Sequence, residues 1–354
     1  MEITEIQVDG YEQVKRCRDE SCGLHALIAV HDTTLGPALG GMRMLPYESE
    51  DEALFDVLRL ARGMTYKSAV AETGLGGGKS VLIGDPGELK SPELFRAMGR
   101  FVENLGGKYI TAEDMNIGVS DLEEVRKSTR WVTGLSRESG SSGNPSPYTA
   151  YGCVQGLRAV MEELFGTPEL EGHSVLVQGI GAVGGRLAVR LKELGAEVIV
   201  CDINQERVDE LVAQHGFTAV PDEGHHRTEC DVYAPCARGA GVNDETIPAL
   251  RCKAVAGCAN NILLEPRHAD ELRQRGILYA PDYVINAGGI INVSVELLPD
   301  GYDEAEALRR IDRIYDNLKL VFDISRGEGI STREAAARLA ERRLAVGRKR
   351  GTGS

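Results

Sequence analysis

The sequence feature that most constrains the fold is an apolar run that leads directly into a glycine-rich turn. Residues 173–178 read H-S-V-L-V-Q, a strand-like pattern. Three glycines with the spacing G-x-G-x-x-G follow this run: Gly179, Gly181 and Gly184. A helical stretch at 186–194 comes next, and a second apolar run, E-V-I-V-C, then leads to Asp202. This order of strand, glycine turn, helix and strand is typical of the parallel β-α-β unit of a doubly wound sheet.

The same segment predicts a dinucleotide site. Backbone amides at the start of the helix would bind the pyrophosphate of the ligand. Asp202 lies roughly 20 residues beyond the glycines, where the fingerprint places a carboxylate that binds the ribose hydroxyls. Because this acid would repel a 2′-phosphate, NAD is favoured over NADP. A glycine turn that serves packing alone is the weaker interpretation, since the strand, the helix and the acid all match.

Small and polar residues follow three further strand-like runs, at 231–234, 253–257 and 277–285. The segments after them read A-P-C-A, A-G-C-A-N-N and N-A-G-G, and they contain three asparagines: Asn260, Asn261 and Asn286. Ligands of open parallel sheets bind at the carboxyl ends of the strands. Any one of these amides can be explained as a loop cap, but we do not expect all three to be loop caps.

The first half of the chain is organised around residues 62–79, R-G-M-T-Y-K-S-A-V-A-E-T-G-L-G-G-G-K. It contains two lysines, Lys67 and Lys79, and three consecutive glycines, 76–78, precede the second. Lysine is normally a solvated surface charge, so two exposed cations beside a loop are one interpretation. The other is that the glycines let the backbone approach a ligand closely and that the lysines converge in a cleft. Burial and mutual repulsion would then lower their pKa values.

Strand-like and helical segments alternate around these lysines. Residues 24–31 are predicted as an apolar strand, and the glycine-rich stretch 36–43 as a turn. Apolar residues recur with helical spacing over 50–64, so Lys67 would follow that helix by one short step. A further helix and strand then lead to Asp114.

The clearest change in composition is at 139–147, S-G-S-S-G-N-P-S-P, where we expect a hinge between two domains. Alternating strands and helices on both sides predict an α/β fold. The first domain, 1–143, would bind the substrate. The second, 144–326, would be a doubly wound Rossmann domain that binds NAD across a cleft. A final helical region, 327–354, would return to complete the first domain.

Composition excludes several classes of protein. A net charge of −14 argues against a nucleic-acid binder, whose phosphate contacts need clustered lysine and arginine. The chain begins with a polar, acidic stretch and has no apolar run near the roughly 20 residues that span a bilayer. We therefore expect no signal peptide and no membrane association. The 8 cysteines lack paired C-x-x-C spacing, so we expect free thiols in a reducing cytoplasm and no bound metal.

A dinucleotide domain combined with two lysines and an aspartate indicates hydride transfer. Such a site must bind a small anion, hold its reacting carbon against the nicotinamide and move protons. One lysine can pair with a carboxylate, and a second with a lowered pKa can act as a general base. Asp114 can transfer a proton or hold an amine. His31 is a competing acid–base group, but a histidine at a strand end is more simply explained as packed or surface-exposed.

A series of short motifs, in order over nearly the whole chain, resembles a known family. The motifs are G-P-A-L-G-G-x-R at 36–43, G-M-T-Y-K at 63–67, G-G-G-K at 76–79, T-A-E-D at 111–114, N-P-S-P-Y-T-A-Y-G at 144–152, G-I-G-A-V-G at 179–184, A-P-C-A at 234–237, A-N-N at 259–261 and P-D-Y-V-I-N-A-G-G at 281–289. The chain resembles the Glu/Leu/Phe/Val amino acid dehydrogenases, and the leucine-specific members look closest.

The resemblance implies reversible, NAD-dependent oxidative deamination of an L-amino acid to a 2-oxo acid, ammonium and NADH. It implies that Lys67 binds the substrate carboxylate with help from Asn260 or Asn261. Lys79 would be the base that activates water, and Asp114 would assist proton transfer at nitrogen. The family also implies a symmetric homo-oligomer.

The resemblance extends to groups that line the site and the cofactor. Gly40 and Gly41 would line the substrate site by their backbone, and Thr149 would reach the nicotinamide carboxamide. The remaining residues implied as cofactor contacts are Gly179, Gly181, Ala182, Val183, Gly184, Asp202, Ile203, Cys236, Ala237, Asn260 and Asn286.

All the residues that match the family's side-chain pocket are apolar: Leu39, Met64, Ala112, Ile290 and Val293. A carboxylate side chain would be buried there without a cation, which is costly. We therefore expect branched aliphatic substrates, leucine first and then valine or isoleucine. An aromatic substrate, phenylalanine or tryptophan, stays an alternative because an aliphatic pocket does not exclude a ring. A catalytically silent NAD-binding regulator is a second alternative, although it would not need both lysines and Asp114.

Overall fold

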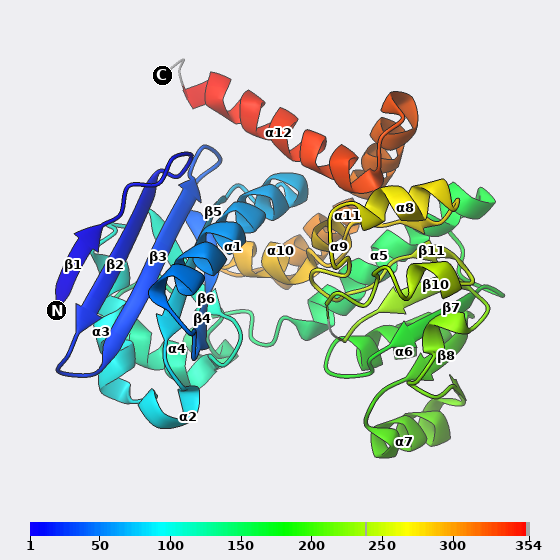
Figure 1. Cartoon of the computed structure of the whole chain (residues 1–354), viewed down its shortest axis with the longest axis horizontal. Coiled ribbons are helices and arrows are strands. Elements are labelled where there is room, and N and C mark those ends of the chain that lie inside the picture. The colour runs from blue at the N-terminus through cyan, green and yellow to red at the C-terminus, as the bar shows by residue number, and fades with distance from the viewer. Residues whose placement is uncertain (238, 352–354) are drawn as a thin grey trace. The chain divides into compact units, whose positions relative to one another are not determined.

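The computed structural model describes residues 1–237 and 239–351. The chain divides into two compact units. The first unit comprises Met1–Asn144, Val293–Asp303 and Ala340–Ser354, and the second comprises Pro145–Asn292 and Glu304–Leu339. Figure 1 shows the elements of each unit in chain order.

The first unit is built on a 6-stranded mixed sheet with the strand order β1-β2-β3-β5-β4-β6. Its strands are β1 (Glu2–Glu5), β2 (Gln13–Asp19), β3 (Leu24–Asp32), β4 (Ala38–Leu45), β5 (Gly76–Ile83) and β6 (Tyr109–Glu113). The pairs from β1 to β5 are antiparallel, whereas β4 is parallel to both β5 and β6. The strand that carries Lys79 and the strand that leads to Asp114 therefore both neighbour β4.

Helices cover both faces of this sheet (Figure 1). They are α1 (Glu50–Ala71), α2 (Pro86–Leu89), α3 (Pro92–Glu103) and α4 (Val119–Arg126), and a 3-10 turn, η1 (Arg137–Ser139), follows. Leu27 and Ala29 of β3 pack in one buried cluster with α1, whereas Ala26 and Ile28 pack in another with α3 and α4. Successive side chains of a strand point to opposite faces, so β3 is buried on both sides.

The prediction of a turn at 36–43 is wrong, because most of this stretch is the strand β4. Its glycines belong to the sheet interior rather than to a turn. A Cβ on Gly40 would lie 1.7 Å from the carbonyl oxygen of Gly78 on the neighbouring strand β5. The glycines thus permit close strand contact, and glycine content alone did not distinguish this from a turn.

The predicted strand at 24–31 is confirmed as β3, but the helix predicted over 50–64 is too short. α1 continues to Ala71 and ends at Glu72, which has a left-handed φ of 52°. Residues of its last turns are buried, and such tertiary packing extends a helix beyond its apolar sequence repeat. Lys67 therefore lies within the helix and not after it.

The second unit contains a 6-stranded parallel sheet with the strand order β12-β11-β10-β7-β8-β9. Its strands are β7 (Ser174–Gln178), β8 (Glu197–Cys201), β9 (Thr218–Ala219), β10 (Cys230–Pro235), β11 (Cys252–Val255) and β12 (Leu278–Tyr279). The chain proceeds from β7 to β8 and β9 on one side and then returns to β10 on the other. This confirms the predicted doubly wound sheet, with its topological switch point between β7 and β10.

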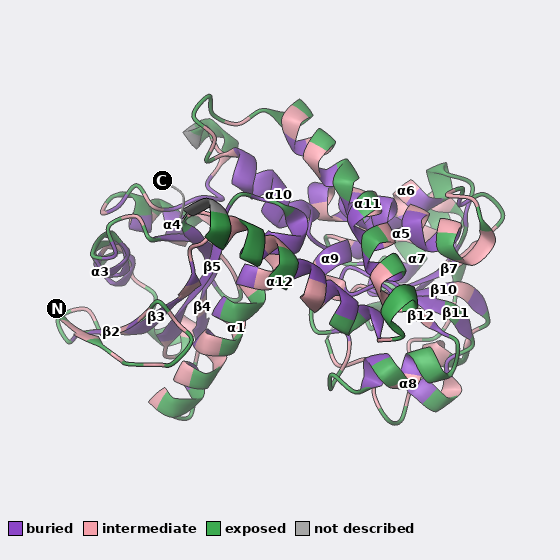
Figure 2. Cartoon of the chain, turned by 90° about the horizontal axis from the view of Figure 1, so that it is seen from above, coloured by how far each residue is buried: buried purple, intermediate pink, exposed green. Residues whose placement is uncertain are grey.

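The helices of the second unit are α5 (Ser146–Phe165), α6 (Gly184–Glu193), α7 (Gln205–His215), α8 (His268–Gln274), α9 (Asp282–Ile285) and α11 (Glu304–Glu328), with the 3-10 turns η2 (His225–Arg227) and η3 (Ile247–Ala249). Two more helices, α10 (Gly288–Val295) and α12 (Thr332–Gly351), contain residues of both units. Figure 2 shows α5 coloured mainly as buried. Among the described residues, no helix combines the length and apolar character needed to cross a membrane.

The strand predicted over 277–285 is wrong in its second half. β12 ends at Tyr279, and Asp282–Ile285 form α9 directly after Pro281. Proline cannot donate to a strand ladder and is compatible with the start of a helix, so the strand stops there.

The unit boundaries differ from the simple two-domain division of the sequence. Segment 293–303 groups with the first unit, and Glu296 explains this placement. Its carboxylate accepts hydrogen bonds from the Ser141 hydroxyl over 2.6 Å and from the Ser142 amide over 2.9 Å. In the C-terminal region, 340–354 group with the first unit and 327–339 with the second.

Candidate active site

Lys79 and Asp114 form the centre of the candidate site in the first unit. Lys79 lies on β5, and Asp114 directly follows β6. The Lys79 Nζ donates a hydrogen bond to Asp114 Oδ2. Lys79 is only 5% exposed, so the structure buries this lysine and brings it together with the predicted aspartate.

Burial controls how this pair titrates. Removing an ammonium group from water disfavours its charged form, and this burial lowers the pKa of Lys79 even though Asp114 opposes it. Burial also disfavours the Asp114 carboxylate, but Lys79, Arg43 and hydrogen bonds together hold the pKa of Asp114 below its usual value. The arrangement favours an ionised Asp114 beside a lysine that releases its proton more readily than an exposed lysine.

A tight turn fixes the direction of Asp114. The Ile117 amide donates to the Asp114 carbonyl over 2.9 Å, and the Met115 amide donates to Asp114 Oδ1 over 2.6 Å. Asn116 has a left-handed φ of 63°, which asparagine tolerates better than most residues. Its side-chain amide donates to the Met44 carbonyl over 3.0 Å. The turn thus holds one carboxylate oxygen and leaves the other for the lysine.

Gly40 and Gly41 make room for the strands and for the aspartate. The Gly40 carbonyl accepts a hydrogen bond of 2.6 Å from the buried Tyr109 hydroxyl. A Cβ on Gly41 would lie 2.7 Å from the Glu113 carbonyl oxygen and 2.8 Å from the Cβ of Asp114. Their expected contact with substrate stays a prediction, but a side chain at Gly41 would displace Asp114.

On the side where a side chain would lie, the glycines before Lys79 pack against protein, and their expected contact with a ligand stays a prediction. A Cβ on Gly77 would lie 2.0 Å from the Thr65 amide nitrogen of α1, and one on Gly78 would lie 2.8 Å from the Tyr109 ring. α1 therefore lies directly against β5. Lys67 is half-buried on the same helix, two residues beyond Thr65.

The residues expected to form the side-chain pocket come from four elements. Leu39 on β4 is buried, and Met64 on α1 and Ala112 on β6 are half-buried. Ile290 and Val293 on α10 are each 9% exposed. Ile290 groups with the second unit and the other four with the first, so their assembly into one pocket stays a prediction.

In the second unit, each glycine of the fingerprint has a distinct environment. Gly179 follows β7 with a φ of 87°, and a Cβ on it would lie 2.4 Å from that of Ala237. A Cβ on Gly184, at the start of α6, would lie 1.9 Å from the Gly179 carbonyl oxygen. A Cβ on Gly181 would have open space, because the nearest atom within reach, Nη1 of Arg207, would lie 4.0 Å from it. This matches a turn, a close helix contact and a backbone that a pyrophosphate can approach.

Asp202 is held in place by the fingerprint loop. It directly follows β8, and its Oδ2 accepts a hydrogen bond of 2.8 Å from the Ile180 amide. Its Oδ1 accepts another, of 2.9 Å, from the Asn204 amide. Ile203 is 80% exposed beside it, and its contact with the cofactor stays a prediction. Ala182 and Val183 lie directly before α6, whose N-terminal amides can bind an anion.

The structure joins two of the three predicted asparagines. The Asn286 side-chain amide donates to Asn260 Oδ1 over 2.7 Å. Asn261 has a left-handed φ of 52°, and its carbonyl accepts from the Ala240 amide over 2.6 Å. The loop-cap interpretation thus applies to part of the Asn286 side chain, which also donates to the Ala259 carbonyl over 3.4 Å.

The remaining predicted cofactor residues lie on two elements. The Cys236 amide donates to the Gln178 carbonyl over 2.7 Å, which places Cys236 and Ala237 at the carboxyl end of β10 beside the fingerprint. Thr149 lies in the first turn of α5, and its hydroxyl donates to the Pro145 carbonyl over 3.1 Å.

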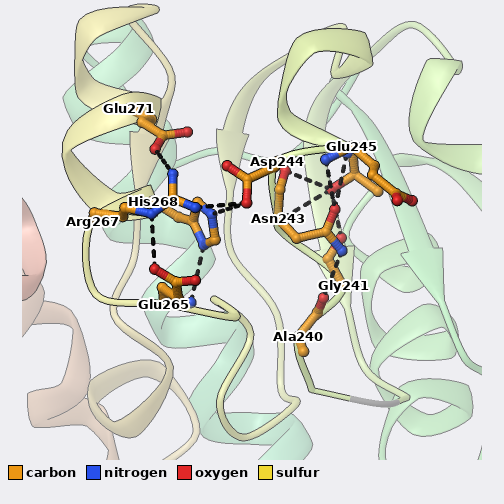
Figure 3. A network of polar contacts seen from close by, with 10 residues as sticks. Ala240, Gly241, Asn243, Asp244, Glu245, Glu265, Arg267, His268 and Glu271 are labelled. Atoms are coloured by element: carbon orange, nitrogen blue, oxygen red, sulfur yellow. Dashed lines mark hydrogen bonds and ion pairs between the residues drawn. The ribbon is translucent and has the colours of Figure 1, made fainter.

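Within the described part of the chain, one cluster of possible metal ligands, Asp244, His268 and Glu271, is filled by an arginine (Figure 3). Arg267 donates to Asp244 over 2.6 Å and to Glu271. The Glu265 amide donates to His268 Nδ1 over 3.0 Å, so the neutral ring carries its proton on Nε2, the nitrogen that faces Asp244 at 3.6 Å. Donors within the protein therefore take the positions that a cation would use.

A second such cluster, Cys201, Asp222 and His225, is also engaged within the protein. The His225 ring contacts the Asp222 carbonyl at 2.5 Å and the Tyr233 hydroxyl at 2.9 Å. Burial raises the pKa of the Cys201 thiol to about 12, which disfavours the thiolate that binds metals.

Sequence reasoning did not assign a role to Arg43 or to its partner Asp56. The Arg43 guanidinium lies between the carboxylates of Asp56 and Asp114. Arg43 ends the motif at 36–43, so a charged residue inside an otherwise apolar strand was the signal that could have identified it.

A Rossmann sheet in one unit and a buried lysine–aspartate pair in the other are the two parts expected of a dehydrogenase. Two family models match the chain: Glu/Leu/Phe/Val dehydrogenase, dimerisation domain, over residues 8–131, and Glutamate/Leucine/Phenylalanine/Valine dehydrogenase over residues 200–350. The chain belongs to this family and is an amino acid dehydrogenase, which confirms the resemblance seen in its motifs.

Individual relatives match over nearly the whole chain. Leucine dehydrogenase from Bacillus cereus is 54% identical, covering 95% of this chain and 91% of its own. Leucine dehydrogenase from Geobacillus stearothermophilus is 54% identical, and the match covers 96% of this chain and 92% of that enzyme. The crystal structure of L-tryptophan dehydrogenase from Nostoc punctiforme superposes with a TM-score of 0.87 at 42% identity, covering 96% and 97%.

Proposed function

We propose that this amino acid dehydrogenase uses NAD and acts on branched-chain L-amino acids, leucine first and then valine or isoleucine. The reaction is reversible oxidative deamination to the 2-oxo acid and ammonium. The observation that carries the proposal is the buried Lys79–Asp114 pair, which gives the first unit a lysine suited to general base catalysis.

Three side chains of the first unit, those of Lys67, Lys79 and Asp114, have separate tasks in the proposed reaction. Bound NAD supplies the acceptor for the hydride that leaves the α carbon of the amino acid. Lys67 pairs with the substrate carboxylate and keeps the amino acid in register. Lys79, as a neutral amine, takes a proton from the water that attacks the imine carbon. Asp114 relays that proton from the Lys79 ammonium to the amine nitrogen. Ammonia then leaves as the hydroxyl oxygen gives its remaining proton to the neutral Lys79 and becomes the product carbonyl.

The apolar pocket supports an aliphatic substrate. Leu39, Met64, Ala112, Ile290 and Val293 provide no charge to pair with an acidic side chain, and burying an unpaired carboxylate is costly. The similarity to two leucine dehydrogenases agrees with this. An aromatic substrate is the second candidate, favoured by the similarity to a tryptophan dehydrogenase.

The cofactor and the assembly follow from other observations. Asp202, held by the fingerprint loop, supports NAD because a carboxylate there would repel the 2′-phosphate of NADP. The family description of the first unit as a dimerisation domain supports a homo-oligomer. The free state of all 8 cysteines fits a reducing cytoplasm.

The proposal is tested by kcat/KM for L-leucine, L-valine, L-isoleucine, L-phenylalanine and L-tryptophan, each with NAD and with NADP. We expect the highest value for L-leucine with NAD. A higher value for an aromatic substrate would overturn the substrate assignment, and a preference for NADP would overturn the role of Asp202. Tight NAD binding without turnover of any L-amino acid would identify a silent regulator instead.

A further inference from the structure

Arg43 is the charged residue of β4, whose other residues are apolar or glycine. β4 lies between β5, which carries Lys79, and β6, which leads to Asp114. Met42 pairs with Glu113 across the parallel ladder, so Arg43 reaches the level of Asp114. The strand order therefore places a guanidinium next to the lysine–aspartate pair.

The guanidinium joins two carboxylates from different elements. Arg43 Nη1 lies 3.1 Å from Asp56 Oδ2 on α1, and Arg43 Nη2 lies 3.5 Å from Asp114 Oδ1. Tyr47 donates its hydroxyl hydrogen to the same Asp56 oxygen over 2.9 Å. A continuous chain of charged contacts thus runs from α1 through Arg43 and Asp114 to Lys79.

This arginine is half-buried, and packing alone does not explain the cost of removing most of its side chain from water. The Arg43 side chain is 17% exposed and that of Asp56 is 15% exposed. The Arg43 Nε is buried and has no hydrogen-bond partner among the described residues. Buried ion pairs often stabilise no better than apolar residues of similar volume. A guanidinium kept under these conditions points to an effect on the charges beside it.

We propose that Arg43 is a positioning residue, which rests on the proposed function: anchored by Asp56, it directs the Asp114 carboxylate toward Lys79 and prevents this pair from holding its shared proton too tightly. Without Arg43, the Asp114 carboxylate would lack a second cation and would attract the lysine ammonium more strongly. The base would then stay protonated to a higher pH.

Other charged groups around Lys79 define what Arg43 adds. The elements packed against β5 carry the following titratable groups: His25, His31 and Asp32 on β3, Arg43 on β4, Tyr47 before α1, Glu50, Asp51, Glu52, Asp56, Arg59, Arg62, Tyr66 and Lys67 on α1, and Tyr109, Glu113 and Asp114 on or after β6. Besides burial, Asp114 and Asp56 raise the pKa of Lys79, and Arg43 lowers it. Arg43 is thus the cation that counters both acids.

The test compares Arg43→Gln, Arg43→Lys and Arg59→Gln with the wild type, using L-leucine at saturating NAD across the acid limb of the pH profile. Arg59 is the matched control, because it also donates to Asp56, over 2.9 Å, but it is 47% exposed. Thermal unfolding midpoints show whether each variant is folded.

For Arg43→Gln, we expect the acid limb of kcat/KM to move to higher pH by about one unit, the usual effect of one nearby charge. We expect kcat to fall about 10- to 100-fold, as for a misplaced catalytic group, with KM for L-leucine changed less than about threefold. Arg43→Lys keeps the positive charge, but a lysine cannot contact Asp56 and Asp114 at the same time as the guanidinium does. We therefore expect kcat to fall while the acid limb stays near the wild-type position. Arg59→Gln leaves both unchanged.

If the wild type is active and the acid limb of Arg43→Gln lies at the same pH as that of the wild type, the inference is overturned. If Arg43→Gln does not fold, Arg43→Lys decides: wild-type kcat in that variant would show that positioning by the guanidinium is not needed. A wild type without L-amino acid turnover would overturn the proposed function itself, so the two failures are distinguishable.

Discussion

At the scale of single residues, the site depends as much on missing side chains as on charged ones. Lys79 can reach Asp114 because the strand between them carries Gly40 and Gly41, and the Asp114 side chain fills the space that a Cβ on Gly41 would need. The turn through Asn116 then fixes the carboxylate from the other side. Both constraints act on one acid and leave it little freedom.

Gly41→Ala is therefore expected to lower activity strongly. Its Cβ would lie 2.8 Å from that of Asp114, closer than any ordinary carbon contact, so the aspartate must move. A displacement of this size costs about 100-fold in kcat, which steady-state rates with L-leucine and NAD measure.

Gly63→Ala is the matched control on α1, where a Cβ would meet nothing within 4 Å. In a helix interior, alanine in place of glycine adds about 0.5–1 kcal/mol to the free energy of unfolding. Equal, wild-type activity of the two variants would show that Gly41 does not position Asp114.

The sequence predicted Lys79 and Asp114, which the structure brings together, but it did not predict the residues that support them. Lys67, Lys79 and Asp114 stand in recognisable motifs, and Asp202 lies at the spacing that the fingerprint requires. Arg43 and Asp56 meet only through the packing of α1 beside β4, because 13 positions separate them in the sequence. No local pattern encodes such a contact.

At the scale of elements, helix and strand periodicity located most elements, but glycine-rich strands were misread. Gly40, Gly41 and the run at 76–78 lie in β4 and β5, where close neighbours leave no room for a Cβ. The sequence shows only that side chains are absent. Whether a turn, a ligand or a neighbouring strand fills the space depends on tertiary structure.

Glu50 joins the first turn of α1 to two strands. It accepts hydrogen bonds from Arg16 over 2.9 Å and from Arg18 over 2.7 Å, and His25 contacts it at 2.7 Å. Burial opposes its ionisation, but Arg18, Arg16 and His25 outweigh burial and lower the pKa of Glu50 to about 2. Since the folded pKa is below the usual value of 4.5 for a glutamate, the stabilisation is present above that pH and is lost as the pH falls toward 2.

Glu50→Gln should therefore destabilise the fold near neutral pH by about 1 kcal/mol, a modest effect because solvent screens these partly exposed groups. The difference from the wild type should shrink between pH 4.5 and 2. Urea unfolding of both proteins across this range measures it, and a difference that stays constant with pH would rule out the ionic origin.

At the scale of the whole molecule, the amino acid dehydrogenase family explains why one chain combines two sheets of different kinds. The mixed sheet carries the lysine–aspartate pair, and the parallel sheet carries the dinucleotide fingerprint at its switch point. The order of motifs predicted this α/β architecture. It did not predict that 293–303 would group with the first unit, because the bonds from 141–142 to Glu296 are not visible in composition.

Light scattering during size-exclusion chromatography should give the mass of an assembly of two or more chains. The reason is that the first unit matches a dimerisation domain over residues 8–131, and soluble homo-oligomers close with point-group symmetry. A mass equal to one chain at micromolar concentration would contradict the proposed homo-oligomer.

The most direct test of the central claim is the rate of NADH formation from L-leucine by Lys79→Ala, with the NAD dissociation constant measured on the same protein. Loss of a general base predicts a fall in kcat of about 100- to 10,000-fold, while the NAD dissociation constant stays within about twofold, because the fingerprint lies in the other unit. Wild-type turnover by this variant would contradict the assignment of Lys79 as the base of an amino acid dehydrogenase.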